Sequence, residues 1–219
     1  MAQKVAYKLS DFTPIISSDS ILFGLYAAPK NTGIETMDDL KEYGQNNKIL
    51  FGSPGKGKPL YESQKQLFEM MGVEYNTITY ENGYKGILNL LGDSTTVLAT
   101  STTVASDYLK TGDLVALSML SPDDFTTEDG VVVKSISSFD KNYDFNNDML
   151  GLFATRAGTD TEIVQYLNDS LRSVFENEEY INEIESIQNT INWKILDSNE
   201  TATFLDNYSK TIGSVTKIQ

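Results

Sequence analysis

The sequence contains neither cysteine nor histidine among its 219 residues. Without cysteine, the chain cannot form disulfides, iron–sulfur clusters, cysteine-ligated zinc sites or a thiolate nucleophile. Without histidine, it lacks the commonest general base of enzymes, the imidazole metal ligand and the base of a Ser-His-Asp triad. Any chemistry would therefore fall to carboxylates, hydroxyls, lysines or backbone amides.

Basic residues and long apolar runs are also scarce. The chain has 17 Lys plus Arg against 31 Asp plus Glu, a net charge of −14, and only two of the cations are Arg. Nucleic-acid binding needs a basic face, so this balance argues against it. The longest apolar run, Ile21 to Ala28, is interrupted by Gly24 and falls far short of the roughly 20 residues of a membrane span. We therefore do not expect an integral membrane protein.

Short apolar runs alternate with helical patterns through the first half of the chain. The length allows one large domain or two small ones, each with a core. Regular alternation of strands and helices with short connections predicts an α/β fold with a parallel sheet covered by helices on both faces. The expected strands are 21–27, 48–51, 75–80, 96–99 and 114–119, and the expected helices are 37–43, 59–71, 84–91 and 103–110. We expect Thr36 to cap the first of these helices and Gly44 to end it.

The segment 121–149 has a different composition, rich in acids and asparagine. It predicts mostly loop, with one strand at Val131–Val133, and we place the edge of a domain here. Its acidic residues lack the alternating ligand spacing and central glycine of an EF-hand, so we expect a solvated loop and no metal site. These acids are Asp123, Asp124, Glu128 and Asp129. A long amphipathic helix follows, with Ile163, Tyr166, Leu167, Leu171, Val174 and Phe175 on one face.

The glycine-rich loop from Gly52 to Lys58 is the most informative stretch. It lies between a predicted strand and a helix that begins at Pro59, where free backbone N–H groups and the helix dipole favour an anion. Its glycines allow close approach of a ligand, and its two lysines add positive charge. We expect phosphate or carboxylate to bind here, through Ser53, Gly55, Lys56, Gly57 and Lys58.

Two other interpretations of this loop stay open. Gly52, Gly57 and Lys58 match the spacing G-x-x-x-x-G-K of a P-loop, but Pro59 stands where the Mg²⁺-binding Ser or Thr belongs. A P-loop-like enzyme that binds nucleotide or phosphate is therefore the less favoured alternative. The loop is also compatible with a tight turn that carries two solvated lysines.

Two further strand ends should meet this loop at the same edge of the sheet, namely Tyr80–Tyr84 and Ala99–Thr103. Ligands of open α/β sheets bind outside the carboxyl ends of the strands. By itself, each strand end has a structural interpretation, with the tyrosines as half-buried core residues and Ser101 and Thr102 as a helix cap. The convergence of the three loops favours a pocket, to which we add Tyr80, Gly83, Tyr84, Thr100 and Ser101 as ligand-binding candidates.

The order of these segments resembles the extracytoplasmic solute-binding proteins of tripartite tricarboxylate transporters, the Bug or TctC-like family. The resemblance begins at Asp11–Pro14, includes the loop Leu50–Gly57 and ends with Gly151–Ala154 and Ala157–Thr159. It implies a type II periplasmic-binding-protein-like α/β fold, in which two lobes with parallel or mixed sheets close on a small carboxylate. Departures from the family pattern are Glu81 in place of a lysine, and Thr96 and Thr100 in place of aspartates.

The resemblance also implies a domain organisation. Residues 27–151 correspond to lobe two, and residues 1–26 with 152–219 correspond to the remainder of lobe one. Family members begin with a strand and a Gly-rich loop that have no counterpart before Asp11, so we expect an incomplete first lobe and self-association through the exposed surface. No signal peptide is visible at the start, and we expect the sequence to be truncated.

Taken together, these patterns predict a solute-binding protein and not an enzyme. It would bind a small organic anion, a di- or tricarboxylate or a similar acid, outside the cytoplasm, in the periplasm or at the cell surface, and present it to membrane permease subunits. We expect no catalytic residue, metal or cofactor. A non-transporting sensor or remnant of the same fold is a further alternative.

Overall fold

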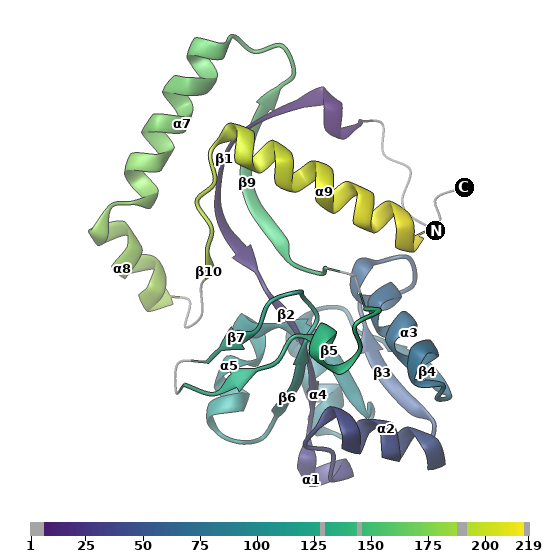
Figure 1. The fold of residues 1–219 in the computed structure, drawn as a ribbon. Helices are drawn as coiled ribbons and strands as arrows, with labels where there is room; N and C mark the ends of the chain where they lie inside the picture. The colour runs from purple at the N-terminus through teal and green to yellow at the C-terminus, as the bar shows by residue number, and fades with distance from the viewer. Residues whose placement is uncertain (1–6, 128–129, 144–145, 188–191, 217–219) are drawn as a thin grey trace. The chain divides into compact units, whose positions relative to one another are not determined.

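The computed structural model describes residues 7–127, 130–143, 146–187 and 192–216. The chain forms two compact units (Figure 1). The larger unit is built on Leu22–Asp148, and the smaller unit on Gln3–Ile21 and Met149–Gly213. The chain therefore passes from one unit to the other directly after Ile21 and directly after Asp148.

The larger unit contains a five-stranded sheet with the order β4-β3-β5-β2-β6. Strands β3, β4 and β5 are parallel, whereas β2 is antiparallel to both β5 and β6. The sheet is therefore mixed, and the prediction of a purely parallel sheet is wrong for β2. The bounds are β2 Phe23–Ala27, β3 Ile49–Ser53, β4 Tyr75–Thr79, β5 Val97–Ser101 and β6 Val115–Met119.

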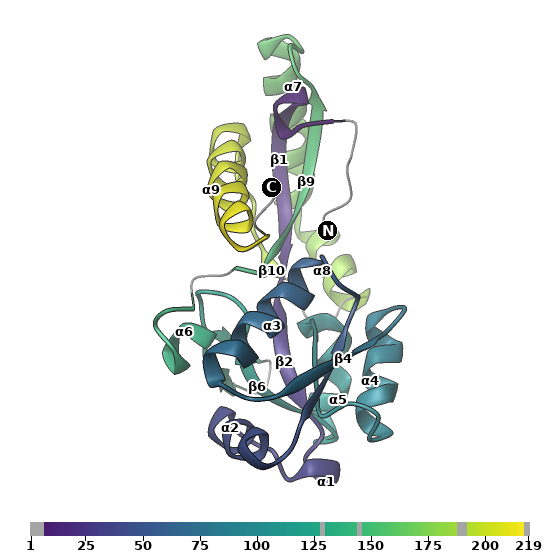
Figure 2. The same cartoon turned by 90° about the vertical axis from the view of Figure 1, so that its right-hand side faces the viewer.

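Helices cover both faces of this sheet (Figure 2). Helices α2 (Met37–Asn46) and α3 (Pro59–Met71) pack on one face, and α4 (Gly83–Leu91) and α5 (Thr102–Lys110) on the other. Shorter elements complete the unit: α1 Pro29–Thr32, α6 Ile136–Phe139 and the hairpin of β7 Phe125–Thr126 with β8 Val132–Val133. Two layers of helix around one sheet confirm the predicted α/β class.

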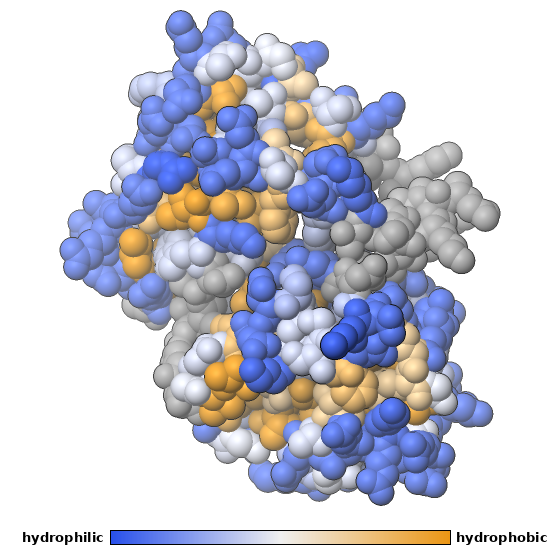
Figure 3. Space-filling model, in the orientation of Figure 1, coloured by the Kyte–Doolittle hydropathy of each residue, from blue (hydrophilic) through white to orange (hydrophobic). Residues whose placement is uncertain are grey.

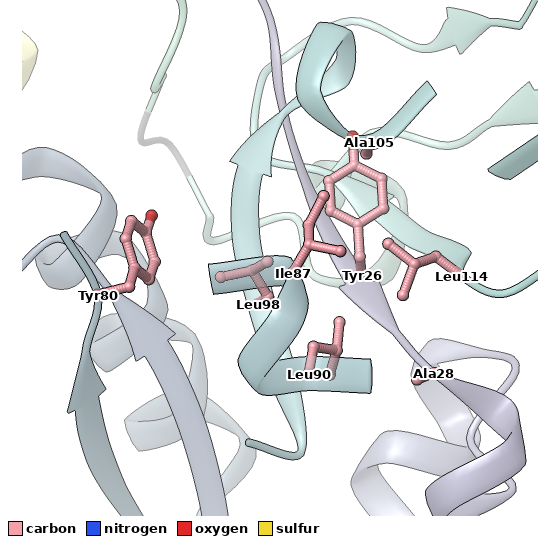
Figure 4. Packing of buried hydrophobic residues seen from close by; sticks show 8 residues of the cluster. All are labelled: Tyr26, Ala28, Tyr80, Ile87, Leu90, Leu98, Ala105 and Leu114. Atoms are coloured by element: carbon pink, nitrogen blue, oxygen red, sulfur yellow. The ribbon is translucent and has the colours of Figure 1, made fainter. Parts of the chain in front are cut away.

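The core of the larger unit lies on both sides of the sheet. Under α4 and α5, the ring of Tyr26 lies among Ile87, Ala105 and Leu114, as Figure 4 shows. Burial raises the pKa of the Tyr26 hydroxyl, so the side chain stays neutral. Under α3, Phe51 packs on Phe68 with ring centroids 5.3 Å apart.

Helix α2 shows where a local stop signal fails. Thr36 caps the helix as predicted, because its side chain accepts from the Asp39 amide and the Asp39 carboxylate accepts from the Thr36 amide. The predicted end at Gly44 is wrong, since the helix continues to Asn46. Gly44 is needed for packing instead, because a Cβ there would lie 2.7 Å from Val73 Cγ1.

The smaller unit contains a three-stranded antiparallel sheet with the order β10-β1-β9. Its helices α7 and α9 flank β1 and β9 (Figure 1). The elements are a short 3-10 helix at Leu9–Asp11, β1 Phe12–Ile21, β9 Met149–Arg156, α7 Thr161–Phe175, α8 Glu178–Ile187, β10 Asn192–Trp193 and α9 Ser198–Thr216.

The smaller unit buries less of its apolar surface. Ile15, Ile16 and Phe175 form its small core under α7. The apolar face predicted for α7 is buried only in part, because Ile163 and Tyr166 are 52% and 71% exposed. Figure 3 shows apolar patches among the polar side chains of this unit.

A groove of about 590 Å³ lies within the smaller unit. Apolar residues from both long strands and from the last helix line much of it, among them Phe12, Leu152, Ala154 and Leu205. Strand β9 is an edge strand, and the sheet on that side ends with it among the described residues. In the part of the chain that the structure describes, no helix is both long and apolar enough to cross a membrane.

Candidate functional site

Three loops of the larger unit follow the carboxyl ends of the parallel strands β3, β4 and β5. The Tyr80 amide donates to the Ser53 carbonyl at 3.0 Å, which joins the first two loops. Gly83 lies so close to the third loop that a Cβ would be 2.7 Å from Thr100 Oγ1. Of the predicted site residues, Ser53 ends β3, Thr100 and Ser101 end β5, and the others lie in the first two loops or at the start of α4.

The first loop connects β3 to α3 and holds an unusual backbone conformation. Gly55 and Gly57 have φ values of 113° and 79°, a region that side chains with a Cβ rarely adopt. Ser53 is fully buried, and its Oγ accepts the Gly55 amide at 3.2 Å. The loop then enters α3 with Lys58 at the N-cap and Pro59 at the first helical position, as predicted.

The charges of this loop lie at its surface. The side chains of Lys56 and Lys58 are exposed, and neither forms an ion pair with a residue that the structure describes. Two cations thus lie beside a helix N-terminus in a chain of net charge −14, an arrangement that favours a locally positive potential.

Glu62 is a residue of this loop region that the sequence analysis missed. It lies in the first turn of α3, and its Oε1 accepts the Gly57 amide at 3.2 Å. The available signal was an acidic residue in the first turn of a predicted helix, which often bonds back to free N–H groups.

In the second loop, the two tyrosines have different environments. Tyr80 is 8% exposed, and its hydroxyl donates to the Ala99 carbonyl at 2.9 Å. Burial raises the pKa of this hydroxyl, which therefore keeps its proton. Tyr84 is 61% exposed. The Tyr80 side chain thus belongs to the core that supports the loops, whereas the Tyr84 side chain reaches solvent.

The third of these loops is the junction at which β5 passes directly into helix α5. Ser101 is its N-cap and accepts the Val104 amide at 3.4 Å, and Thr100 is 3% exposed. Ser101 is half-buried, so it is the more accessible of the two residues at this strand end. The capping role that the sequence suggested for Ser101 is confirmed.

The acidic segment after β6 forms local structure. The Asp124 carboxylate accepts the Lys134 ammonium and the Ser135 amide, both at 2.8 Å, and these bonds hold the pKa of Asp124 below its usual range. Glu128 and Asp129 lie outside the described residues. Among the residues that are described, no group of three carboxylates is arranged to hold a metal ion.

Comparison with known families shows what kind of chain carries these loops. The family of tripartite tricarboxylate transporter receptors, TctC, matches residues 1–218. The chain belongs to this family. A search among proteins of curated function finds no match to the TctC chain described here.

Solved structures of TctC-type proteins share the fold. A TctC solute-binding protein from Polaromonas has a TM-score of 0.78 at 19% identity, over 98% of this chain and 72% of that chain. An adipate-bound protein of R. palustris has a TM-score of 0.76 at 15% identity, over 99% and 73%. Malate-bound MatC from Rhodopseudomonas palustris has a TM-score of 0.71 at 14% identity, over 98% and 73%. These likenesses confirm the predicted type of α/β fold.

Proposed function

We propose that this TctC-family protein is an extracytoplasmic solute-binding protein that captures a small organic carboxylate and presents it to the permease subunits of a tripartite transporter. The observation that carries the proposal is the β3–α3 loop. There, a glycine-rich turn, a helix N-terminus and the exposed Lys56 and Lys58 come together. Binding and release of an unchanged solute need no general base and no metal, in keeping with the absence of histidine and cysteine.

The proposed contacts follow from the geometry of the loops. Backbone amides near Gly55 and Gly57, together with the two lysines, would bind one carboxylate. The Ser53 and Thr100 hydroxyls are buried and would order the loops, whereas Ser101 and Tyr84 would reach the solute. The backbone of Tyr80 and Gly83 would form the wall of the site between the first and the third loop.

We propose that residues 27–151 act as the second lobe of a binding protein, and that residues 1–26 and 152–219 belong to the first. Lobe closure on the bound solute would then create the form that the permease recognises. Two relatives hold adipate and malate, so dicarboxylates are the first solutes to test.

A thermal-shift screen over dicarboxylates, tricarboxylates, aromatic acids and acidic amino acids tests the proposal. A true ligand at 100 times its Kd adds about 2.7 kcal/mol to the free energy of unfolding. Gly55→Val should abolish this shift, because valine cannot adopt the φ of 113° without distorting the loop.

Gly112→Val provides the matched control. Gly112 also has a positive φ, 73°, but it lies after α5 with no atom near its Cβ position. The control should lose stability and keep the ligand shift. A ligand shift retained in Gly55→Val would place the site elsewhere, and flat curves over the whole panel would favour the non-transporting sensor or remnant.

The alternative of a P-loop-like enzyme has its own measurement. It requires Mg²⁺-dependent hydrolysis of ATP or GTP that is lost in Lys58→Ala. We expect no turnover, because Pro59 at the first position of α3 has no hydroxyl for the metal.

We also propose that the smaller unit self-associates through the edge of strand β9. Exposed edge strands pair readily with a second chain. Residues 149–156 contain no acid and one cation, Arg156, so the electrostatic repulsion between two copies of this acidic chain is small there. Analytical ultracentrifugation should show a concentration-dependent dimer that Leu152→Lys abolishes. A monomer at all concentrations would refute this proposal.

A further inference from the structure

The Glu62 side chain already occupies part of the proposed anion site. Its Oε1 accepts the Gly57 amide at 3.2 Å, and the residue is only half-buried. A ligand carboxylate bound by the loop amides would use the same kind of donor. The loop therefore contains an internal carboxylate that competes with the ligand for a backbone N–H group.

The amides of Gly55 and Lys58 donate to uncharged acceptors within the loop itself. The Gly55 amide donates to Ser53 Oγ, and the Lys58 amide donates to the Gly55 carbonyl at 3.3 Å. Among these bonds, only that of Gly57 goes to a charged group at the end of a flexible side chain. An anion can displace such a group by a rotation of the side chain, without unfolding the turn.

Gln64 bonds to the start of the turn independently of Glu62. It is fully buried, and its Nε2 donates to the Gly52 carbonyl at 3.1 Å and to the Leu60 carbonyl at 2.9 Å. Its Oε1 has no hydrogen-bond partner in the described part of the chain. An unmet acceptor in a buried carboxamide that is bonded to the start of the loop indicates a missing donor, which a water or a ligand hydroxyl would supply.

We propose that Glu62 is a built-in competitor that lowers the affinity of the carboxylate site. This inference rests on the function proposed above. In the free protein, Glu62 holds the Gly57 amide, and an incoming carboxylate displaces it. A monocarboxylate only exchanges one anion for another at the helix N-terminus. A dicarboxylate gains a further attraction to Lys56 or Lys58, whereas displacement of Glu62 lowers the apparent affinity of mono- and dicarboxylates by the same factor.

Isothermal titration calorimetry with adipate, malate and propionate tests the competitor. An anion at a helix N-terminus contributes up to about 1 kcal/mol, so Glu62→Gln should bind adipate about fivefold more tightly than the unaltered protein. Propionate should gain by about the same factor, because both ligands displace the same carboxylate. The free variant should melt at a lower temperature, because α3 loses the carboxylate of its first turn.

Glu69→Gln is the matched control. Glu69 lies on the same helix, and the substitution removes the same charge about 10 Å further along the axis. Its contacts with Lys65 and the Tyr75 hydroxyl are exposed, so we expect unchanged affinity. Glu62→Ala, which also removes the acceptor oxygen, should change affinity in the same direction as Glu62→Gln.

The outcomes separate the two proposals. Lower melting temperature together with tighter adipate binding supports the competitor, because a purely structural role of Glu62 would weaken or leave unchanged the affinity. Equal or weaker binding in both Glu62 variants, with clear binding by the unaltered protein, overturns the competitor alone. Absence of binding by the unaltered protein and by every variant overturns the proposed function with it.

Discussion

The two units of the chain bury their sheets to very different extents. Every residue of β2 in the larger unit is buried, and so are four of the five residues of β5. In the smaller unit, no residue of β9 is buried, although that strand has eight residues. The difference arises because neighbouring elements shield the two sheets from solvent to different extents. Central strands of the larger sheet have neighbours on both sides and helices on both faces, whereas β9 is an edge strand beside an open groove.

This contrast indicates where a rigid binding loop can be built. The three candidate loops all begin at strand ends of the well-covered sheet, so their backbones are fixed by the packing beneath them. The smaller unit has exposed apolar side chains instead, which suit contacts with other protein surfaces. Four substitutions or conditions test the contrast, and the sole tryptophan, Trp193 in the smaller unit, provides a fluorescence signal for that unit.

Leu98→Ala should have the largest effect. Leu98 is fully buried, and its Cδ1 lies 2.8 Å from the Cβ positions of Gly52 and Gly86. We expect a loss of about 2 to 5 kcal/mol in urea unfolding followed by circular dichroism. Leu88→Ala, at a position 62% exposed on α4, should cost less than about 0.5 kcal/mol. Equal losses would contradict the view that burial in the larger unit dominates its stability.

Ser17→Ala tests the smaller unit. Ser17 is fully buried, donates to the Lys194 carbonyl and accepts the Leu196 amide at 2.9 Å. Alanine leaves both backbone groups without this partner, and we expect a loss of about 2 kcal/mol in unfolding followed by Trp193 fluorescence. Ser18→Ala, a neighbour on β1 with its hydroxyl on Asp19, is the control. An equal loss by fluorescence and by circular dichroism would mean that the two units do not unfold separately.

Tyr80→Phe separates support of the loops from contact with the ligand. The variant leaves the buried Ala99 carbonyl without the hydroxyl, which should cost about 1 kcal/mol. Because the ring remains in the core, we expect the ligand-induced thermal shift to be preserved. Tyr84→Phe is the complementary change at the exposed ring. If Tyr80→Phe lost the ligand shift at full stability, its hydroxyl would be a ligand contact after all.

Acid should weaken the larger unit slightly. Bonds from the Thr36 side chain and the Glu35 amide lower the pKa of Asp39, and the Lys30 ammonium lowers that of Asp113. A carboxyl whose pKa is lower in the folded state stabilises the fold when the pH is above the ordinary pKa of the group, which is 3.8 here. This contribution disappears as the pH falls through the pKa of the folded state. The urea concentration at the midpoint of unfolding should therefore decrease when the pH is lowered below about 4. The decrease should be smaller in Asp39→Asn. An identical fall in that variant would assign the effect to other carboxyls.

The sequence predicted the local features of the larger unit well. Proline at the first position of α3 and threonine and serine caps on α2 and α5 are short-range signals, because each acts within four residues. Gly44 was misread as a stop because its role depends on Val73, which is distant in the sequence. The direction of β2 was missed because strand pairing is a long-range property that the apolar pattern of the strand does not encode.

For the candidate site, the sequence indicated the three loops, but the structure distinguished the roles of their residues. The pattern of glycine, lysine and proline predicted an anion loop, since backbone freedom and helix dipoles are local properties. The Tyr80 hydroxyl donates to the Ala99 carbonyl, and the Glu62 carboxylate accepts the Gly57 amide. Both bonds depend on the direction of the side chain, which the sequence pattern does not give.

By itself, the sequence determined the α/β class, the glycine-rich loop with its two lysines and the absence of histidine and cysteine chemistry, because composition and short-range patterns are sufficient for these. Only the tertiary structure decided the strand order, the contrast between a covered and an open sheet, and the internal carboxylate in the loop. These features arise from contacts between segments far apart in the chain or from the direction of single side chains, which no local pattern specifies.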